Sequence, residues 1–154
     1  MMIRSKTRLW ICVGLLVTNI IFIWGNSLLP GEISGAFSDW VNSLLAPLFG
    51  WDTDAPGGGG LLRKIAHFTE FACLGVCLRW LWGMLEAKRL QPFLYALAAA
   101  VAVACIDETI QIFVPLRGPG IKDVLIDTAG AITGISILSF AHWLKTKKLE
   151  ENKL

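Results

Sequence analysis

The sequence predicts an all-α integral membrane protein: a four-helix bundle with a short amphipathic interfacial helix in the first outer loop. Of its 154 residues, 55% are hydrophobic and 17% are charged, and its mean hydropathy is +0.59, so the chain is more apolar than a soluble domain. Four apolar runs reach or approach the length of about 20 residues that crosses a bilayer. They are roughly residues 9–29, 61–82, 93–114 and 121–144. We expect a single transmembrane domain over residues 1–154.

The distribution of basic residues predicts the orientation of these runs. If the chain crosses the membrane four times, ten of its 14 Lys and Arg residues fall on the side of the two termini. Basic residues favour the cytoplasmic side, so we expect a multi-pass protein of the cell membrane with both termini in the cytoplasm. The first run lacks a small-residue cleavage site and is predicted to remain as a helix. We expect membrane lipids as partners and no nucleic acid, and a dimer is compatible with the sequence.

The connections between the runs predict how the helices are joined. Apolar residues recur at helical spacing in the long first connection and predict a short amphipathic helix from Ser34 or Ser38 to Leu45, with Pro47 disturbing its end. These residues are Phe37, Trp40, Val41, Leu44, Leu45 and Leu48. The helix is expected to lie in the outer interface on its apolar face, or to cover the mouth of the bundle. The third connection is so short that the last two runs must be antiparallel neighbours.

Eight ionisable residues lie in or next to the apolar runs, where their burial is costly and usually marks a site. They are Lys64, His67, Glu70, Asp107, Glu108, Arg117, Asp123 and Asp127. At 1.5 Å of rise per residue, His67, Asp107 and Asp127 each lie about 9 Å below the outer boundary. The inner halves carry no comparable polar face. We therefore expect one outward-facing polar pocket that is closed below by a dry core.

The residue types predict two kinds of role within this pocket. His67, Glu108 and Asp107 are the candidate catalytic residues, because imidazole and carboxylate groups exchange protons. The candidate binding residues are Lys64, Glu70, Gln111, Arg117, Asp123 and Asp127. Arg117 and Lys64 suit a phosphate or carboxylate. The alternative is that these groups only pair with one another and hold the bundle together. Ser27 is a further candidate nucleophile.

Neither a metal nor a cofactor is expected from the sequence. One histidine among carboxylates could hold Mg²⁺ or Mn²⁺, but the nearby Arg and Lys residues oppose a cation. Cys73 and Cys77 share a helix face, where small packing residues are the simpler interpretation. Gly130 and Gly134 form a Gly-x-x-x-Gly motif, whose expected role is close helix packing.

Three strings of residues resemble the VanZ-like membrane protein family. The strings are Lys64-Ile-Ala-His67-Phe-Thr-Glu70-Phe, Asp107-Glu108-x-x-Gln111-x-Phe113-x-Pro115-x-Arg117 and Lys122-Asp123-x-x-x-Asp127-x-x-Gly130-x-x-x-Gly134. The family's usual asparagine near the last motif corresponds to Asp127 here, which adds a negative charge. The resemblance implies an integral membrane protein linked to low-level resistance to glycopeptide antibiotics such as teicoplanin. It does not settle the biochemical activity.

Two functions follow for the predicted pocket. It binds the head group of an antibiotic, a lipid or a lipid-linked cell-wall precursor without turnover, or it belongs to a membrane hydrolase or transferase that acts on a lipid-linked envelope substrate through His67 and Glu108. The chain contains neither Gly-x-Ser-x-Gly nor His-Glu-x-x-His. Binding without turnover is therefore the favoured function. Transport is disfavoured because four short helices are too few for an alternating-access monomer.

Overall fold

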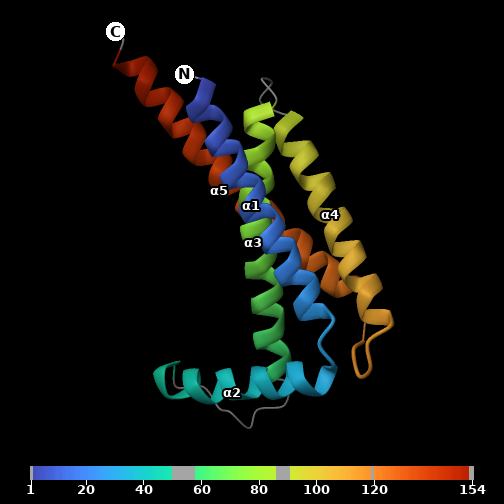
Figure 1. Cartoon of the computed structure of the whole chain (residues 1–154). Helices are drawn as coiled ribbons and strands as arrows, with labels where there is room; N and C mark the ends of the chain where they lie inside the picture. Colours follow the sequence, from blue (N-terminus) through green and yellow to red (C-terminus); the bar gives the residue numbers. More distant parts are fainter. Residues whose placement is uncertain (1, 50–57, 86–90, 119, 153–154) are drawn as a thin grey trace.

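Five helices make up the described part of the chain, which in this computed structural model comprises residues 2–49, 58–85, 91–118 and 120–152 (Figure 1). They are α1 (Met2–Ser27), α2 (Gly31–Phe49), α3 (Gly58–Leu85), α4 (Gln91–Ile112) and α5 (Ile121–Glu151). All except α2 contain a segment long and apolar enough to cross a membrane. The described residues include no strand, and the predicted all-α membrane bundle is confirmed.

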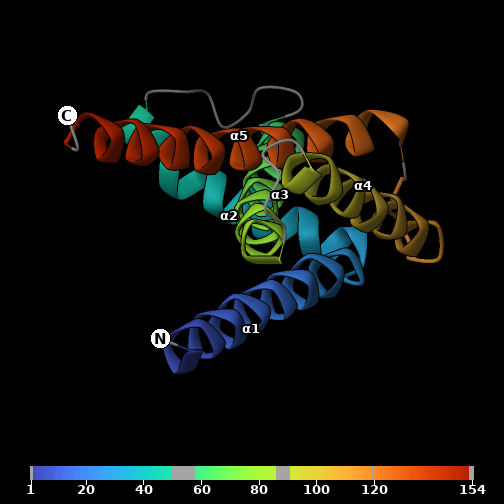
Figure 2. The same cartoon turned by 90° about the horizontal axis from the view of Figure 1, so that it is seen from above.

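The helix α2 lies across one end of the bundle, and both chain termini lie at the other end (Figure 1). We call these the α2 end and the terminal end. The view from above places α3 between α1 on one side and α5 on the other (Figure 2). Every other helix contacts α3, and the contact with α5 is the most extensive. Polar residues carried by α3 are therefore within reach of several helices.

The α2 helix is longer than the sequence predicts. It begins at Gly31, whose N–H donates to the Pro115 carbonyl over 3.0 Å, and ends at Phe49. A side chain at Gly31 would overlap the Leu116 carbonyl, so a glycine is needed for this close approach. Pro47 lies inside the helix, which continues to Phe49. The lost N–H affects only the final turn, which explains why the helix continues for two more residues.

The polar face of α2, and not its apolar face, is turned towards the rest of the protein. Ser34, Ser38 and Asn42 are buried. The large apolar side chains on the helix are exposed. They are Ile33, Phe37, Trp40, Leu44 and Leu48. Of the two predicted placements, the structure therefore favours a helix that covers the end of the bundle with its small polar side inward.

Glycines bring α3 and α5 into backbone contact. A Cβ atom at Gly130 would overlap the Phe68 carbonyl, and one at Gly134 would overlap the Ala72 carbonyl. On the opposing helix, a Cβ atom at Gly75 would overlap the Ala131 carbonyl. The packing role predicted for Gly130 and Gly134 is confirmed, because only small residues allow this close approach.

One face of α4 is a buried stripe of small residues. Ala96, Ala100 and Ala104 are fully buried in a core that also contains Phe71 and Ile135. The same face continues towards the α2 end, where the buried residues become polar at positions 107, 108 and 111. The apolar core and the polar residues thus follow one another along the same buried face of α4. We call the part with the polar residues the polar level of the bundle.

Among the described residues, the expectation of a dry inner half is wrong at Arg79 and its partner Ser139. Arg79, in the half of the bundle near the termini, is buried, and its Nε donates to Ser139 Oγ over 2.9 Å. The guanidinium lies against Gly83, one turn further along α3, where there is no side chain to exclude it. Arg79 therefore extends along its own helix towards the terminal end, as long basic side chains do in membranes.

Candidate functional site

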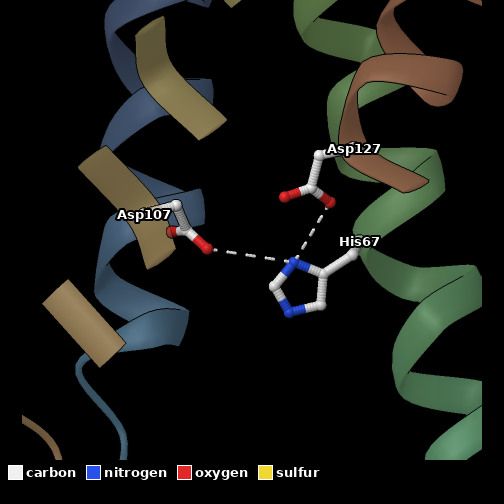
Figure 3. A group of neighbouring side chains, drawn as sticks. All are labelled: His67, Asp107 and Asp127. Atoms are coloured by element: carbon white, nitrogen blue, oxygen red, sulfur yellow. Dashed lines mark ion pairs between the residues drawn. The ribbon is translucent and has the colours of Figure 1, made fainter. Parts of the chain in front are cut away.

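Three helices bring one histidine and two aspartates together inside the bundle. His67 lies on α3, Asp107 on α4 and Asp127 on α5 (Figure 3). The His67 Nδ1 atom lies 3.5 Å from an oxygen of Asp127 and 4.0 Å from an oxygen of Asp107. Both aspartates are fully buried, and the exposed fraction of His67 is 7%. We call these three residues the His–Asp cluster.

The packing of α3 against α5 explains this convergence. Asp127 lies three residues before Gly130, whose backbone meets the Phe68 carbonyl next to His67. Residues three and four apart share a helix face, so the close approach at Gly130 carries the short Asp127 side chain to the imidazole. Asp107 reaches the same place because it follows Ala104 on the buried stripe of α4.

Most polar atoms of the His–Asp cluster have no hydrogen-bond partner among the described residues. These atoms are His67 Nδ1, Asp107 Oδ1 and both carboxylate oxygens of Asp127. Buried polar groups in proteins are nearly always hydrogen-bonded, and each unsatisfied group costs about 1–3 kcal/mol. Asp127 is the extreme case, because neither of its oxygens makes such a bond and its partner is His67 Nδ1 at 3.5 Å. These atoms make the His–Asp cluster a candidate binding site.

Gln111 connects the His–Asp cluster to its neighbours on α1 and α4. Its Nε2 lies 3.0 Å from Asp107 Oδ2, 3.3 Å from Glu108 Oε1 and 3.3 Å from Ser27 Oγ. Ser27 is fully buried at the end of α1. Gln111 therefore acts as an interhelix hydrogen-bond partner and holds the Asp107 carboxylate in place.

Glu108 is occupied by two hydrogen bonds within the protein. Its Oε2 accepts from the Gly120 N–H over 2.8 Å, and its Oε1 accepts from Gln111. This arrangement ties α4 to the start of α5. In the described part of the chain, the carboxylates within 4.0 Å of the His67 imidazole are Asp107 and Asp127. The structure therefore brings His67 together with these two aspartates and not with Glu108, with which the sequence-based hypothesis combined it.

Arg117 closes the same end of the bundle from the turn between α4 and α5. Its Nε donates to the Leu29 carbonyl over 3.1 Å, and its Nη2 donates to the Asn26 carbonyl over 2.8 Å. A cation is favourable beside the carbonyls that end a helix. Burial, and secondly the like charge of Arg63, lowers the pKa of the Arg117 guanidinium, which nevertheless remains charged at neutral pH. Its Nη1 is without a hydrogen-bond partner in the described residues.

The remaining predicted site residues lie at the margin. Glu70 Oε1 accepts from Asn26 Nδ2 over 3.0 Å, and its Oε2 is buried without a partner in the described chain. Lys64 is exposed, and Asp123 is half-buried in the first turn of α5. Within the described residues, no hydrogen bond or ion pair joins either side chain to the His–Asp cluster. The structure therefore brings Glu70 close to the site but leaves these two outside it.

Asn26 contributes to this region although the sequence analysis did not select it. It supplies an amide to Glu70 and a carbonyl to Arg117. Together with Ser27, it ends the first apolar run on the side that carries the other polar residues. Their position at this end of the run is a signal from which the sequence alone could have grouped both residues with the other polar residues.

The fold and the site define the class of the protein. It is a membrane protein whose described residues include four apolar helices long enough to span a membrane, and the buried residues His67, Asp107 and Asp127 converge in the half of the bundle near α2. The family model described as VanZ/LLP1 matches residues 9–142, and the chain belongs to this family. Searches of curated proteins and of solved structures found no significant match.

Proposed function

We propose that this VanZ/LLP1-family membrane protein binds the polar head group of an amphiphile at the α2 end of its bundle. The candidates are a lipid, a lipid-linked cell-wall precursor and a lipoglycopeptide antibiotic. The observation that carries the proposal is a group of buried atoms without hydrogen-bond partners among the described residues. Six of the nine such atoms belong to the His–Asp cluster, Glu70 (Oε2) and Arg117 (Nη1), and the other three belong to Asn19, Trp24 and Arg79.

The chemistry of these atoms fits a head group with both anionic and hydrogen-donating parts. Arg117 suits a phosphate or carboxylate, whereas Asp107, Asp127 and Glu70 accept from hydroxyl or ammonium groups. A phospholipid and a lipid-linked sugar phosphate both contain these parts. We propose that the outward-facing pocket predicted from the sequence opens between these residues.

The charge distribution supports an outer-leaflet location for this site. Basic residues are concentrated at the terminal end, and that end is therefore expected to be cytoplasmic. The α2 end then faces outward, and its exposed apolar residues, such as Trp40 and Phe37, are placed to contact lipid. This location also suits the link to glycopeptide resistance that the family resemblance implies, since these antibiotics act outside the membrane.

A membrane hydrolase or transferase is the second candidate. One observation favours it: His67 Nδ1 faces two carboxylates, while the other ring nitrogen points away from both (Figure 3). Carboxylates that orient an imidazole in this way occur in general acid–base catalysis. In this structure, the acid–base group would be His67 with Asp107 or Asp127, in place of His67 with Glu108.

Native mass spectrometry of the protein released from nanodiscs tests the binding function. Nanodiscs containing a phospholipid, a lipid-linked precursor or teicoplanin are compared for wild type, His67→Ala and Arg117→Ala. We expect wild type to retain one of these amphiphiles and both variants to retain at least about tenfold less. Lys122→Ala is the control, because Lys122 is an exposed basic residue near the same end. Equal retention by all four proteins would contradict the proposal.

The pools of lipid-linked precursors in cells separate binding from catalysis. A binding protein is expected to leave these pools unchanged while it alters antibiotic susceptibility. A chemically altered precursor that appears with wild type and disappears with His67→Ala would instead establish the enzyme.

A further inference from the structure

We infer that His67, Asp107 and Asp127 bind one divalent transition-metal ion, Mn²⁺ or Zn²⁺, between α3, α4 and α5. One potential ligand atom from each residue lies within 4.8 Å of the others, and all three residues are buried. The inference deepens the proposed function, because it concerns the same cluster and names what holds the head group there.

The separation of His67 Nδ1 from the Asp127 oxygen fits coordination better than direct hydrogen bonding. A tetrahedral Zn²⁺ site with nitrogen and oxygen ligands at about 2.0–2.2 Å has ligand atoms about 3.3–3.6 Å apart. His67 Nδ1 and the Asp127 oxygen are separated by 3.5 Å, which lies in this range and beyond the usual N–H···O distance of about 2.7–3.2 Å. The 4.0 Å separation from Asp107 requires an approach of only about 0.5 Å to match it.

The charges of the three residues also favour a divalent cation. Two carboxylates with a neutral imidazole carry a charge of −2, which is costly inside an apolar bundle. A divalent ion makes the assembly neutral. With one ligand atom from each residue, it also supplies a partner for an oxygen of Asp127 and for His67 Nδ1, neither of which has a hydrogen-bond partner in the described chain. A protonated imidazole alone would leave one negative charge uncompensated.

No hydrogen bond or ion pair joins a Lys or Arg side chain of the described residues to the two aspartates of the cluster. The sequence-based expectation of no metal rested on nearby Arg and Lys residues. In the structure, Arg117 directs two of its nitrogens to the carbonyls of Leu29 and Asn26, and Lys64 is exposed. Gln111 donates to Asp107 Oδ2 over 3.0 Å, and such outer hydrogen bonds orient metal-binding carboxylates.

The ligand set explains what the ion would do. One imidazole nitrogen and carboxylate oxygens suit Mn²⁺ and Zn²⁺. Three protein ligands leave at least one coordination position for water or for an oxygen of a bound molecule. A phosphate oxygen of the head group is the ligand that an ion at this depth would accept. The cation would thus join the carboxylates of the site to an anionic head group that they would otherwise repel.

Metal binding to tag-free protein in detergent tests this inference directly. After treatment with a chelator, the protein is titrated with Mn²⁺ or Zn²⁺ alone. We expect one ion per chain and, for Mn²⁺, a ¹⁴N coupling in pulsed electron paramagnetic resonance from the imidazole of His67. His67→Ala is expected to remove the coupling, and Asp127→Asn to weaken binding at least about tenfold.

Two control variants match these substitutions. The chain has two histidines, and the second, His142, is exposed. His142→Ala and Asp39→Asn, which changes an exposed aspartate, are expected to bind the metal as wild type does. Should a cluster variant fail to fold, wild type and His142→Ala decide the question, because both must show the ¹⁴N coupling. Absence of stoichiometric binding by wild type, or a coupling lost in His142→Ala, would overturn the inference.

The same preparations distinguish this inference from the proposed function. Retention of an amphiphile in the presence of chelator, without metal binding, would overturn the inference and keep the function. Metal binding by protein that retains no amphiphile would do the reverse.

Discussion

At the scale of single residues, the predicted site residues fall into two groups, according to whether their polar atoms have hydrogen-bond partners within the protein. The Glu108 carboxylate oxygens and the Gln111 amide nitrogen form hydrogen bonds to other parts of the protein. His67 and Asp127 have buried atoms that no described residue satisfies. Residues of the first kind hold the helices together, and we propose that residues of the second kind bind a ligand. The role of Glu108 as an acid or base stays a prediction, and its two hydrogen bonds favour a role in holding the helices together.

Glu108→Gln is predicted to destabilise the bundle. Both carboxylate oxygens of Glu108 accept hydrogen bonds, from Gly120 and Gln111. A glutamine offers only one oxygen and would place its amide group against a donor, so we expect the free energy of unfolding to fall by about 1–3 kcal/mol. Unfolding in detergent measures the loss, with Glu150→Gln as the control because Glu150 is exposed. Unchanged stability would show that Glu108 does not tie α4 to α5.

At the scale of helices, the site depends on how closely α3 and α5 approach. Gly130 and Gly134 set that distance, and Asp127 lies on the same face of α5. The polar level of the bundle thus depends on packing one and two turns away from it. A change in the helix interface should therefore alter the site without touching any polar atom.

Gly134→Ala tests this dependence. The added methyl group would overlap the Ala72 carbonyl, and overpacking of this kind costs about 1–3 kcal/mol. We expect a lower unfolding temperature and weaker binding of Mn²⁺ or of the retained amphiphile. Gly14→Ala is the matched control, since no atom lies within 4 Å of the added position. If both variants behaved as wild type does, the close contact would not position Asp127.

The sequence predicted the spans and the polar level because both depend on one-dimensional quantities. Hydropathy located the membrane segments, and helical rise placed His67, Asp107 and Asp127 at one depth. The rotation of each helix could not be predicted in the same way, since it depends on packing between helices. This explains why Glu108 was assigned to His67, why the inward face of α2 remained open, and why the contact of Arg79 with Ser139 was missed.

At the scale of the whole molecule, the bundle has an apolar core that stabilises the fold and a polar level whose atoms are incompletely satisfied. The core residues Ala100, Leu74 and Ile135 lie towards the terminal end from the His–Asp cluster. Unsatisfied buried groups lower stability, and binding sites are where proteins commonly retain such groups. We therefore propose that the cluster binds a ligand and lowers the stability of the ligand-free protein.

The unfolding temperature of Asp127→Asn, measured in chelator-treated and delipidated protein, tests this central claim most directly. The substitution removes a buried charge whose oxygens have no hydrogen bond in the described residues, while keeping the size of the side chain. We predict that the variant unfolds at the same temperature as wild type or higher, and that it loses binding of the metal and of the amphiphile. A variant that unfolds at a clearly lower temperature, with binding retained, would show that Asp127 serves the fold and would contradict the account.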